Sequence, residues 1–409
     1  MKMHLTPEDK LLLSVVKLYP STEELEYMNA LIPQITDWEV FTKSIIAHGS
    51  APLLFKKLCL LGNAQLIPVD VITKLQQAYY KTLTRSMVLY EGFIKVVGAF
   101  TAADIQVVSL KGVYLSECLY GDIALRQFSD IDMLVREEDG EKCLEILSGM
   151  GFIPYTTNMT EFIDSQAEIV HYKPMVKGDI SVEVHIRLHR KSKQYNIKTA
   201  RFINNAIPVT INKTEVYALQ LYDLLIYLCV HLDKHFGGGY VQMKCFNDIV
   251  NLLSINEKVI DWQLFIDACR LHECEELVFK YLVMVNRFYQ VPLPQNILTS
   301  YSNLLKIADV ERFMYYLHDV EIKKYHVTTH LENMSGTKSL SDKLRYFIEL
   351  AFPPKKFMIE KYGNKFIIYN LQFIITKRNK IRLPWWMLYP YRWGVGVKGV
   401  IQLIRTPNP

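Results

Sequence analysis

The sequence lacks the features that mark several specialised classes of protein. Its seven cysteines are scattered over 409 residues without any Cys-x-x-Cys spacing, which predicts reduced core thiols rather than a disulfide framework. The first residues, Met-Lys-Met-His-Leu-Thr-Pro-Glu-Asp-Lys, contain no apolar signal segment. No apolar run reaches the roughly 20 residues that a transmembrane helix needs. We therefore expect a cytoplasmic protein without a transmembrane segment.

An excess of one charge is also missing. Lys and Arg number 47 and Asp and Glu number 42, which leaves a formal net charge of only +5. This balance allows an anionic substrate, but a nucleic-acid-binding protein would show a strong basic stripe. Half of the residues are hydrophobic and 22% are charged, a composition typical of a globular protein with a large core.

The hydrophobic pattern divides the chain into a mixed middle and helical ends. Between about Ile105 and His189 strands alternate with helices, and Gly178-Asp179 predicts a hairpin turn. Helical periodicity prevails on both sides of this stretch. We expect an α+β (mixed α/β) fold, in which a small mixed sheet is flanked by helical N- and C-terminal domains. The expected division is an N-terminal helical region (1–90), a sheet core (91–215), a helical domain (216–310) and a C-terminal helical region (311–409).

Two aspartates at the start of a short buried strand carry the first functional signal. Asp130 and Asp132 flank Ile131, and the apolar run from Ile131 to Val135 predicts the strand. Side chains at i and i+2 share one face of a strand, so both carboxylates point the same way. Two carboxylates this close repel each other unless a cation lies between them. Because oxygen ligands suit Mg²⁺ or Mn²⁺, the pair predicts a divalent-metal site.

A second signal lies just upstream of these aspartates. Ile105 to Leu110 predicts a strand, Lys111-Gly112 follows at once, and Val113 to Leu119 predicts a helix. A strand, a glycine turn and a helix N-terminus direct backbone N–H groups and the positive helix dipole toward one point. Lys111 adds a full charge there. The pattern is not a Walker A loop, because Gly-x-x-x-x-Gly-Lys-[Ser/Thr] is absent, and it predicts a shorter phosphate site.

A third carboxylate, Glu183, lies in a strictly alternating segment that predicts a strand. Apolar residues form one face and polar residues the other: Val182, Val184, Ile186 and Leu188 against Glu183, His185, Arg187 and His189. Two interpretations are open. On an edge strand the polar face would lie in water. In a site, Glu183 would join Asp130 and Asp132, and Arg187 would lie near the phosphates.

The order of these motifs resembles the polymerase-β-type nucleotidyltransferase superfamily. The motifs are Leu110-Lys111-Gly112, Arg126, Ser129-Asp130-Ile131-Asp132 and the later Glu183. They are most similar to a family of uncharacterised bacterial nucleotidyltransferases, over residues from about 38 to 370, and abortive-infection-type toxin nucleotidyltransferases show a similar pattern. The loop of the wider superfamily is Gly-Ser, whereas Lys-Gly is followed by Val113 here.

The resemblance implies an enzyme that moves a nucleoside monophosphate from an NTP to an acceptor by a two-metal mechanism. Asp130, Asp132 and Glu183 would carry catalysis and hold Mg²⁺ or Mn²⁺. The residues implied in binding the nucleotide and its phosphates are Lys111, Gly112, Arg126, Ser129 and Arg187. The acceptor, whether a small molecule, a protein or RNA, stays open. The alternative is a non-catalytic nucleotide-binding protein or an accessory protein of a biosynthetic cluster.

The chain after the sheet core supplies candidate acceptor-side residues. Lys244 and Asp248 stand at i,i+4 spacing, either as an ordinary ion pair or with Asp248 as an acceptor-side base. His185 is a further acceptor-side candidate. His231 and His235 end an apolar helix, where they either complement the helix dipole or form a metal site.

Two helical segments repeat one pattern. Asp37-Trp38-Glu39-Val40-Phe41 matches Asp261-Trp262-Gln263-Leu264-Phe265, and His48 matches His272 at the same offset. Each Asp would cap a helix, with Trp and Phe on its buried face. Both segments are interpreted either as repeated units or as ordinary amphipathic helices, and in each case as packing elements.

The tail from Lys377 interleaves Lys and Arg with aromatic residues, among them Trp385, Trp386 and Trp393. Such a composition suits packing on the helical domain, a partner surface or the edge of a membrane. Its prolines and short apolar runs argue against a transmembrane helix.

Overall fold

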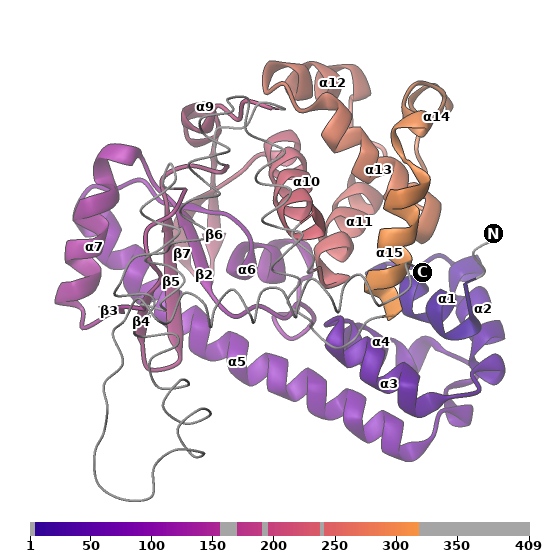
Figure 1. Cartoon of the computed structure of the whole chain (residues 1–409). Coiled ribbons are helices and arrows are strands. Elements are labelled where there is room, and N and C mark those ends of the chain that lie inside the picture. Colours follow the sequence, from indigo (N-terminus) through magenta and orange to yellow (C-terminus); the bar gives the residue numbers. More distant parts are fainter. Residues whose placement is uncertain (1–4, 156–169, 190–194, 238–240, 319–409) are drawn as a thin grey trace, which may run out of the picture. The chain divides into compact units, whose positions relative to one another are not determined.

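The computed structural model describes residues 5–155, 170–189, 195–237 and 241–318 (Figure 1). Apart from Tyr155, these residues belong to one compact unit. One mixed sheet of seven strands and many helices make up this part of the chain, which confirms the predicted α+β class. None of its helices is both long enough and apolar enough to cross a membrane. The basic-aromatic tail lies outside the described residues.

The sheet has the strand order β3-β4-β5-β2-β1-β7-β6. Its two central pairings run in opposite senses, because β2 is parallel to β5 and antiparallel to β1. The predicted hairpin is present between β4 and β5, and Gly178 takes a positive φ of 56° in its two-residue turn. The strands are β1 (Val108–Ser109), β2 (Ile131–Leu134), β3 (Ile153–Pro154), β4 (Met175–Lys177), β5 (Ile180–His185), β6 (Ile207–Ile211) and β7 (Thr214–Ala218).

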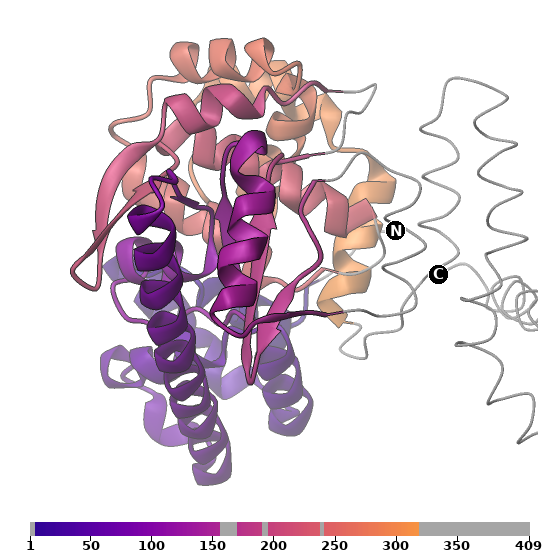
Figure 2. The same cartoon turned by 90° about the vertical axis from the view of Figure 1, so that its left-hand side faces the viewer.

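Alternation along the strands gives the sheet two different faces. Met133 of β2 and Val184 of β5 pack into an apolar cluster with α5 (Val69–Ala102) and α7 (Gly140–Gly149). Figure 2 shows α7 in front of the strands on this side. Residues one position away face the opposite side, where Leu134 packs into the cluster that contains the helices after β7. The polar residues of β2 and β5 therefore point toward those helices.

Helices precede the first strand and follow the last strand along the chain. Glycine turns and side-chain caps set several of their ends; Ser21, for example, forms a capping box with Glu24. The expected boundary at residue 90 falls inside the continuous helix α5, so the division into four regions stays a description of the sequence. The remaining helices are α1 (Pro7–Ser14), α2 (Thr22–Leu31), α3 (Trp38–Ala47), α4 (Ala51–Lys57), α6 (Gly112–Tyr114), α9 (Thr199–Asn204), α10 (Leu221–Gly237), α11 (Lys244–Asn256), α12 (Trp262–Leu271), α13 (Glu275–Tyr289), α14 (Gln295–Tyr301) and α15 (Ile307–His318), with a π-helical stretch, Leu115–Leu119, directly after α6.

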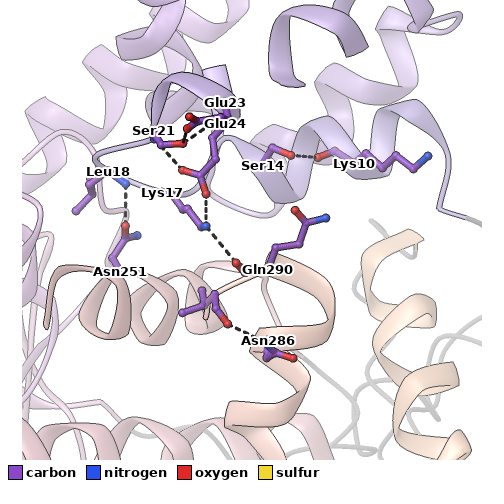
Figure 3. Close-up of polar contacts among 11 residues, drawn as sticks. Lys10, Ser14, Lys17, Leu18, Ser21, Glu23, Glu24, Asn251, Asn286 and Gln290 are labelled. Carbon is purple, nitrogen blue, oxygen red and sulfur yellow. Dashed lines mark hydrogen bonds and ion pairs between the residues drawn. The ribbon is translucent and has the colours of Figure 1, made fainter. Parts of the chain in front are cut away.

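The N-terminal helices are tied to the helices beyond the sheet by specific hydrogen bonds (Figure 3). The backbone N–H of Leu18 donates to Asn251 Oδ1 on α11 at 2.8 Å. Lys17 forms an ion pair with Glu24 and donates to the carbonyl oxygen of Gln290 at 3.4 Å. Segments far apart in the sequence therefore pack together on the side of the sheet toward which its polar residues point.

The two repeated segments form equivalent helices, α3 and α12. Asp37 and Asp261 accept hydrogen bonds from backbone N–H groups three residues on, at 2.9 and 3.0 Å. In each helix the Trp ring meets the Phe ring edge-on, with centroids 5.6 Å apart in α3 and 6.2 Å apart in α12. His48 and His272 both stand at the helix C-cap. The repeat is thus a packing device, as predicted.

Candidate active site

The polar face of the sheet brings three ligand-type side chains together. Asp132 and Glu183 are paired in register on the parallel strands β2 and β5. His185, two residues along β5, places Nε2 3.0 Å from Asp132 Oδ1 and 3.6 Å from Glu183 Oε2. One ligand atom from each residue lies within 4.8 Å of the other two. β5 lies between β4 and β2, so the interpretation of Glu183 on a solvated edge strand is wrong.

Lys111 approaches the same carboxylate from β1. Its Nζ lies 3.2 Å from Asp132 Oδ2 and 3.0 Å from His231 Nε2, so it links β2 to α10. Gly112 makes the turn that follows. It has a φ of 41°, and a Cβ there would lie 3.3 Å from the carbonyl oxygen of Asp130. Only glycine fits this turn without strain, because it combines positive φ with close backbone approach.

Burial and charge act against each other at Lys111 and Asp132. Burial disfavours the ammonium group, but the nearby carboxylates, Asp132 foremost, hold the pKa of Lys111 above its ordinary value. Burial likewise disfavours the carboxylate of Asp132, but Lys111 and His185 hold its pKa below its usual range. Both groups are therefore charged at neutral pH, and they stabilise each other's charge.

The outer carboxylates of the site respond differently. Burial and the charge of Asp132 raise the pKa of Asp130 to about 6. Burial also opposes the charge of Glu183, but the hydrogen bond from His185 lowers the pKa of that carboxyl. Asp130 is half-buried at the start of β2 and does not belong to the close triad within the described residues. A nearby cation would lower this raised pKa.

Helix α10 contributes a polar stripe that faces the carboxylates. Tyr227, His231 and His235 recur at i, i+4 and i+8, and their rings follow one another with centroids 5.9 and 4.6 Å apart. Burial and the charge of Lys111 hold the pKa of His231 well below its ordinary value, so it accepts from Lys111 as a neutral imidazole. Tyr227 was not among the predicted site residues, although its i, i+4, i+8 spacing with His231 and His235 on an apolar helix was a signal for it.

Arg126 and Asp248 face each other rather than the carboxylate triad. Arg126 donates from Nε to Asp248 Oδ1 at 2.8 Å and from Nη2 to Oδ2 at 2.7 Å. Tyr120 donates its hydroxyl to Oδ1 at 3.0 Å. Arg126 and Asp248 are buried, with side chains 8% and 3% exposed. This bidentate pair joins the segment before β2 to α11, and it engages both the predicted phosphate ligand and the predicted acceptor-side base.

The other predicted site residues lie around the triad. Arg187 donates to Glu137 Oε1 at 2.8 Å, beyond the ends of β5 and β2. The carbonyl oxygen of Ser129 accepts from Arg85 of α5 at 2.8 Å, which anchors the loop before Asp130. Lys244 is half-buried at the start of α11, and its charge acts on both Asp130 and Arg126. Among the described residues, Lys244 has neither a hydrogen-bond nor an ion-pair partner.

Unsatisfied polar atoms concentrate at this site. In the described part of the chain, five buried side-chain atoms have no hydrogen-bond partner: Asp132 Oδ2, His185 Nδ1, the Tyr227 hydroxyl, Asn247 Oδ1 and Ser254 Oγ. The first three belong to the triad or to the stripe on α10. Buried polar groups are normally satisfied, and exceptions call for a functional explanation. A polar or cationic ligand would supply the missing contacts.

Comparison with known proteins agrees with this geometry. Searches of curated proteins and of solved structures returned no match. A family model described as "Uncharacterised nucleotidyltransferase" matches residues 34–290, a span that contains the sheet, the triad and the helices α10 and α11. Since the match covers more than half of the 409 residues, the chain belongs to this uncharacterised nucleotidyltransferase family.

Proposed function

We propose that the protein transfers a nucleoside monophosphate from an NTP to an acceptor by a two-metal mechanism. An oxygen or nitrogen atom of the acceptor would attack the α-phosphorus, and the bond to the bridging oxygen of pyrophosphate would break. The observation that carries the proposal is the in-register pair Asp132 and Glu183, which faces Lys111 in a chain of the nucleotidyltransferase family.

The carboxylates present fit a divalent cation. Asp132 and Glu183 offer oxygen atoms on one face, and the half-buried Asp130 has a raised pKa that a nearby cation would lower. Bound Mg²⁺ or Mn²⁺ would neutralise phosphate charge and polarise the phosphorus for attack. Within this arrangement Asp132 holds the centre, Glu183 completes it, and Asp130 faces the incoming nucleotide. Positioning and charge neutralisation would supply most of the catalysis.

The cationic side chains near the carboxylates occupy two kinds of position, one buried and one more open. Lys111 lies at the centre, held by Asp132 and His231, where it can meet a phosphate oxygen without leaving the site. We assign the more open phosphate position to Lys244 rather than to Arg126, because the guanidinium of Arg126 is committed to Asp248. The acceptor would then lie along the stripe of Tyr227, His231 and His235.

Label transfer tests the proposal directly. The full-length protein is incubated with each of the four α-³²P-labelled NTPs, Mg²⁺ or Mn²⁺, and a cell extract as the source of acceptor. We expect metal-dependent transfer of label to one class of product from a preferred NTP. Asp132→Asn should abolish the transfer, whereas Glu141→Gln, an exposed carboxylate on α7, should leave it unchanged.

The same experiment separates catalysis from simple nucleotide binding. Saturable NTP binding without labelled product, in extracts from several growth conditions, would support a non-catalytic nucleotide-binding or accessory protein. Label transfer that persists in the Asp132→Asn variant would place the chemistry elsewhere in the chain.

A further inference from the structure

The triad contains a nitrogen ligand that a purely carboxylate metal site would lack. His185 belongs to β5, and its side chain is only 9% exposed. Among the described residues, Nδ1 has no hydrogen-bond partner, so the ring makes its polar contacts through Nε2 alone. That atom points at both carboxylates. The imidazole therefore lies where it could join both carboxylates in binding one metal ion.

The two distances from His185 Nε2 to the carboxylates are close to those between neighbouring ligand atoms of one metal ion. Metal–ligand bonds of about 2.1 Å place adjacent ligand atoms of an octahedral ion about 3 Å apart. His185 Nε2 lies 3.0 Å from Asp132 Oδ1 and 3.6 Å from Glu183 Oε2. Lys111 approaches the other oxygen of Asp132, Oδ2, and would not compete for the same position. The ligand atoms of all three residues lie within 4.8 Å of one another, so one ion between them could contact each residue.

We propose that His185 is a direct metal ligand, and that this mixed carboxylate–imidazole site selects a first-row transition cation such as Mn²⁺ over Mg²⁺. Imidazole nitrogen suits transition metals, whereas Mg²⁺ prefers an all-oxygen environment. The inference deepens the proposed function, since it assigns the chemistry of one of its two metals. Asp130, outside the triad, remains for the ion that accompanies the nucleotide phosphates.

Mn²⁺ binding to the nucleotide-free protein tests this inference. Electron paramagnetic resonance measures free Mn²⁺ during a titration, and pulsed spectra report ¹⁴N coupling at the bound ion. For the wild-type protein we expect ¹⁴N coupling and an affinity for Mn²⁺ at least about tenfold above that for Mg²⁺. Bound Mn²⁺ without ¹⁴N coupling in the wild-type protein would overturn the proposal, and this measurement needs no variant.

Substitutions then identify the nitrogen. His185→Gln should lose the ¹⁴N coupling and weaken Mn²⁺ binding about tenfold or more, with a much smaller effect on Mg²⁺. His185→Asp should bring the affinities for the two ions closer together, because the site becomes all oxygen. His171→Gln is the matched control, since its ring lies beside that of His185 with centroids 5.0 Å apart, and it should keep the coupling. Unchanged coupling in His185→Gln would show that another group supplies the nitrogen.

The two proposals fail in different ways. If Mn²⁺ binds with ¹⁴N coupling but no NTP transfers label, the metal assignment stands and the proposed reaction falls. If label transfer depends on Asp132 but bound Mn²⁺ shows no ¹⁴N coupling, the reaction stands and the role of His185 falls.

Discussion

In the described part of the chain, two buried clusters that each combine acidic and basic side chains are built differently. Asp248, Arg126 and Tyr120 form a closed set in which both carboxylate oxygens accept hydrogen bonds. Asp132 lies between two cationic or polar side chains, yet its Oδ2 accepts no hydrogen bond. The first cluster, here called the closed cluster, is complete without a ligand. The second, the open cluster around Asp132, is not.

The difference teaches how structural and functional charges can be told apart. A buried charge is tolerated when its partners satisfy it, and removal of one partner leaves the other uncompensated. At the triad, by contrast, several carboxylates share Lys111 and His185, so charge of the same sign accumulates around Asp132. Such an arrangement gains from an added cation, whereas the pair of Arg126 and Asp248 gains nothing.

The largest effect on stability is expected at the closed cluster. Arg126→Ala leaves the carboxylate of Asp248 buried without its bidentate partner, and should lower the free energy of unfolding by about 3–5 kcal/mol. Urea denaturation followed by circular dichroism measures the loss. The double variant Arg126→Met, Asp248→Leu is the control, because two apolar residues leave no buried charge, and it should recover most of the stability. A double variant as unstable as the single one would contradict this account.

At the open cluster the large effect should fall on activity. Asp132→Asn removes a metal ligand, and label transfer should drop by at least about 10²–10³-fold, as for the loss of a key electrostatic contact. Its free energy of unfolding should change less than that of Arg126→Ala. The buried ammonium of Lys111 still has the negative charges of Asp130 and Glu183 nearby when Asp132 is neutralised. Denaturation curves of both variants, measured without metal, make the comparison. An equal loss of stability in both would remove the distinction between the clusters.

Local features of both regions were predictable from the sequence. Alternation placed Glu183 and His185 on one face of a strand, and both side chains lie with Asp132 in the triad. Asp130, which the i, i+2 spacing predicted to share the face of Asp132, lies just before β2 and outside the triad. The hairpin at Gly178 and the caps at Asp37 and Asp261 followed from residue type. In each case the interacting groups lie within a few residues of one another, where backbone geometry alone fixes the outcome.

The rest depended on contacts between distant segments. Arg126 meets Asp248 122 residues further on, and Lys111 meets His231 120 residues further on. No periodicity reports such pairs. Arg126 was therefore predicted to bind phosphate, and Asp248 either to pair with Lys244 or to act as a base, because each was considered without its partner. The register of β2 against β5 was likewise beyond local pattern, although the family resemblance pointed to it.

A smaller effect on stability is expected at Lys111, which lies beside Asp132 in the open cluster. Lys111→Met removes the cation that forms an ion pair with Asp132 Oδ2, and should cost about 1–3 kcal/mol of stability in the metal-free protein, the range for a buried polar group that loses its partner. Saturating Mn²⁺ should restore much of this loss, since a bound cation replaces the missing charge and stabilises the folded state by mass action. Thermal unfolding with and without Mn²⁺ measures both effects. Equal melting temperatures for the metal-free variant and wild-type protein would show that Lys111 does not neutralise Asp132.

The smallest effect is expected at a third pair of charged residues, Asp9 of α1 and His318 at the end of α15. His318 Nε2 lies 3.0 Å from both carboxylate oxygens of Asp9, and the His318 side chain is 53% exposed.

The hydrogen bond to Asp9 raises the pKa of His318 above its ordinary 6.5, so this contribution to stability is present below pH 6.5 and is lost as pH rises through the folded-state value. Burial opposes the charge of Asp9, but His318 and the Thr6 N–H lower its pKa below 3.8, so its contribution is lost as pH falls through that lowered value. The pair should therefore stabilise the protein most between these limits. Melting temperatures of wild-type protein and His318→Gln should differ most near pH 5. The difference should be small, as is typical of exposed pairs, and should shrink as the pH rises above 6.5 and through the folded-state pKa of His318. A difference that is constant from pH 5 to pH 8 would show that His318 acts through packing and not through its charge, and the pair would then belong with neither of the two buried clusters.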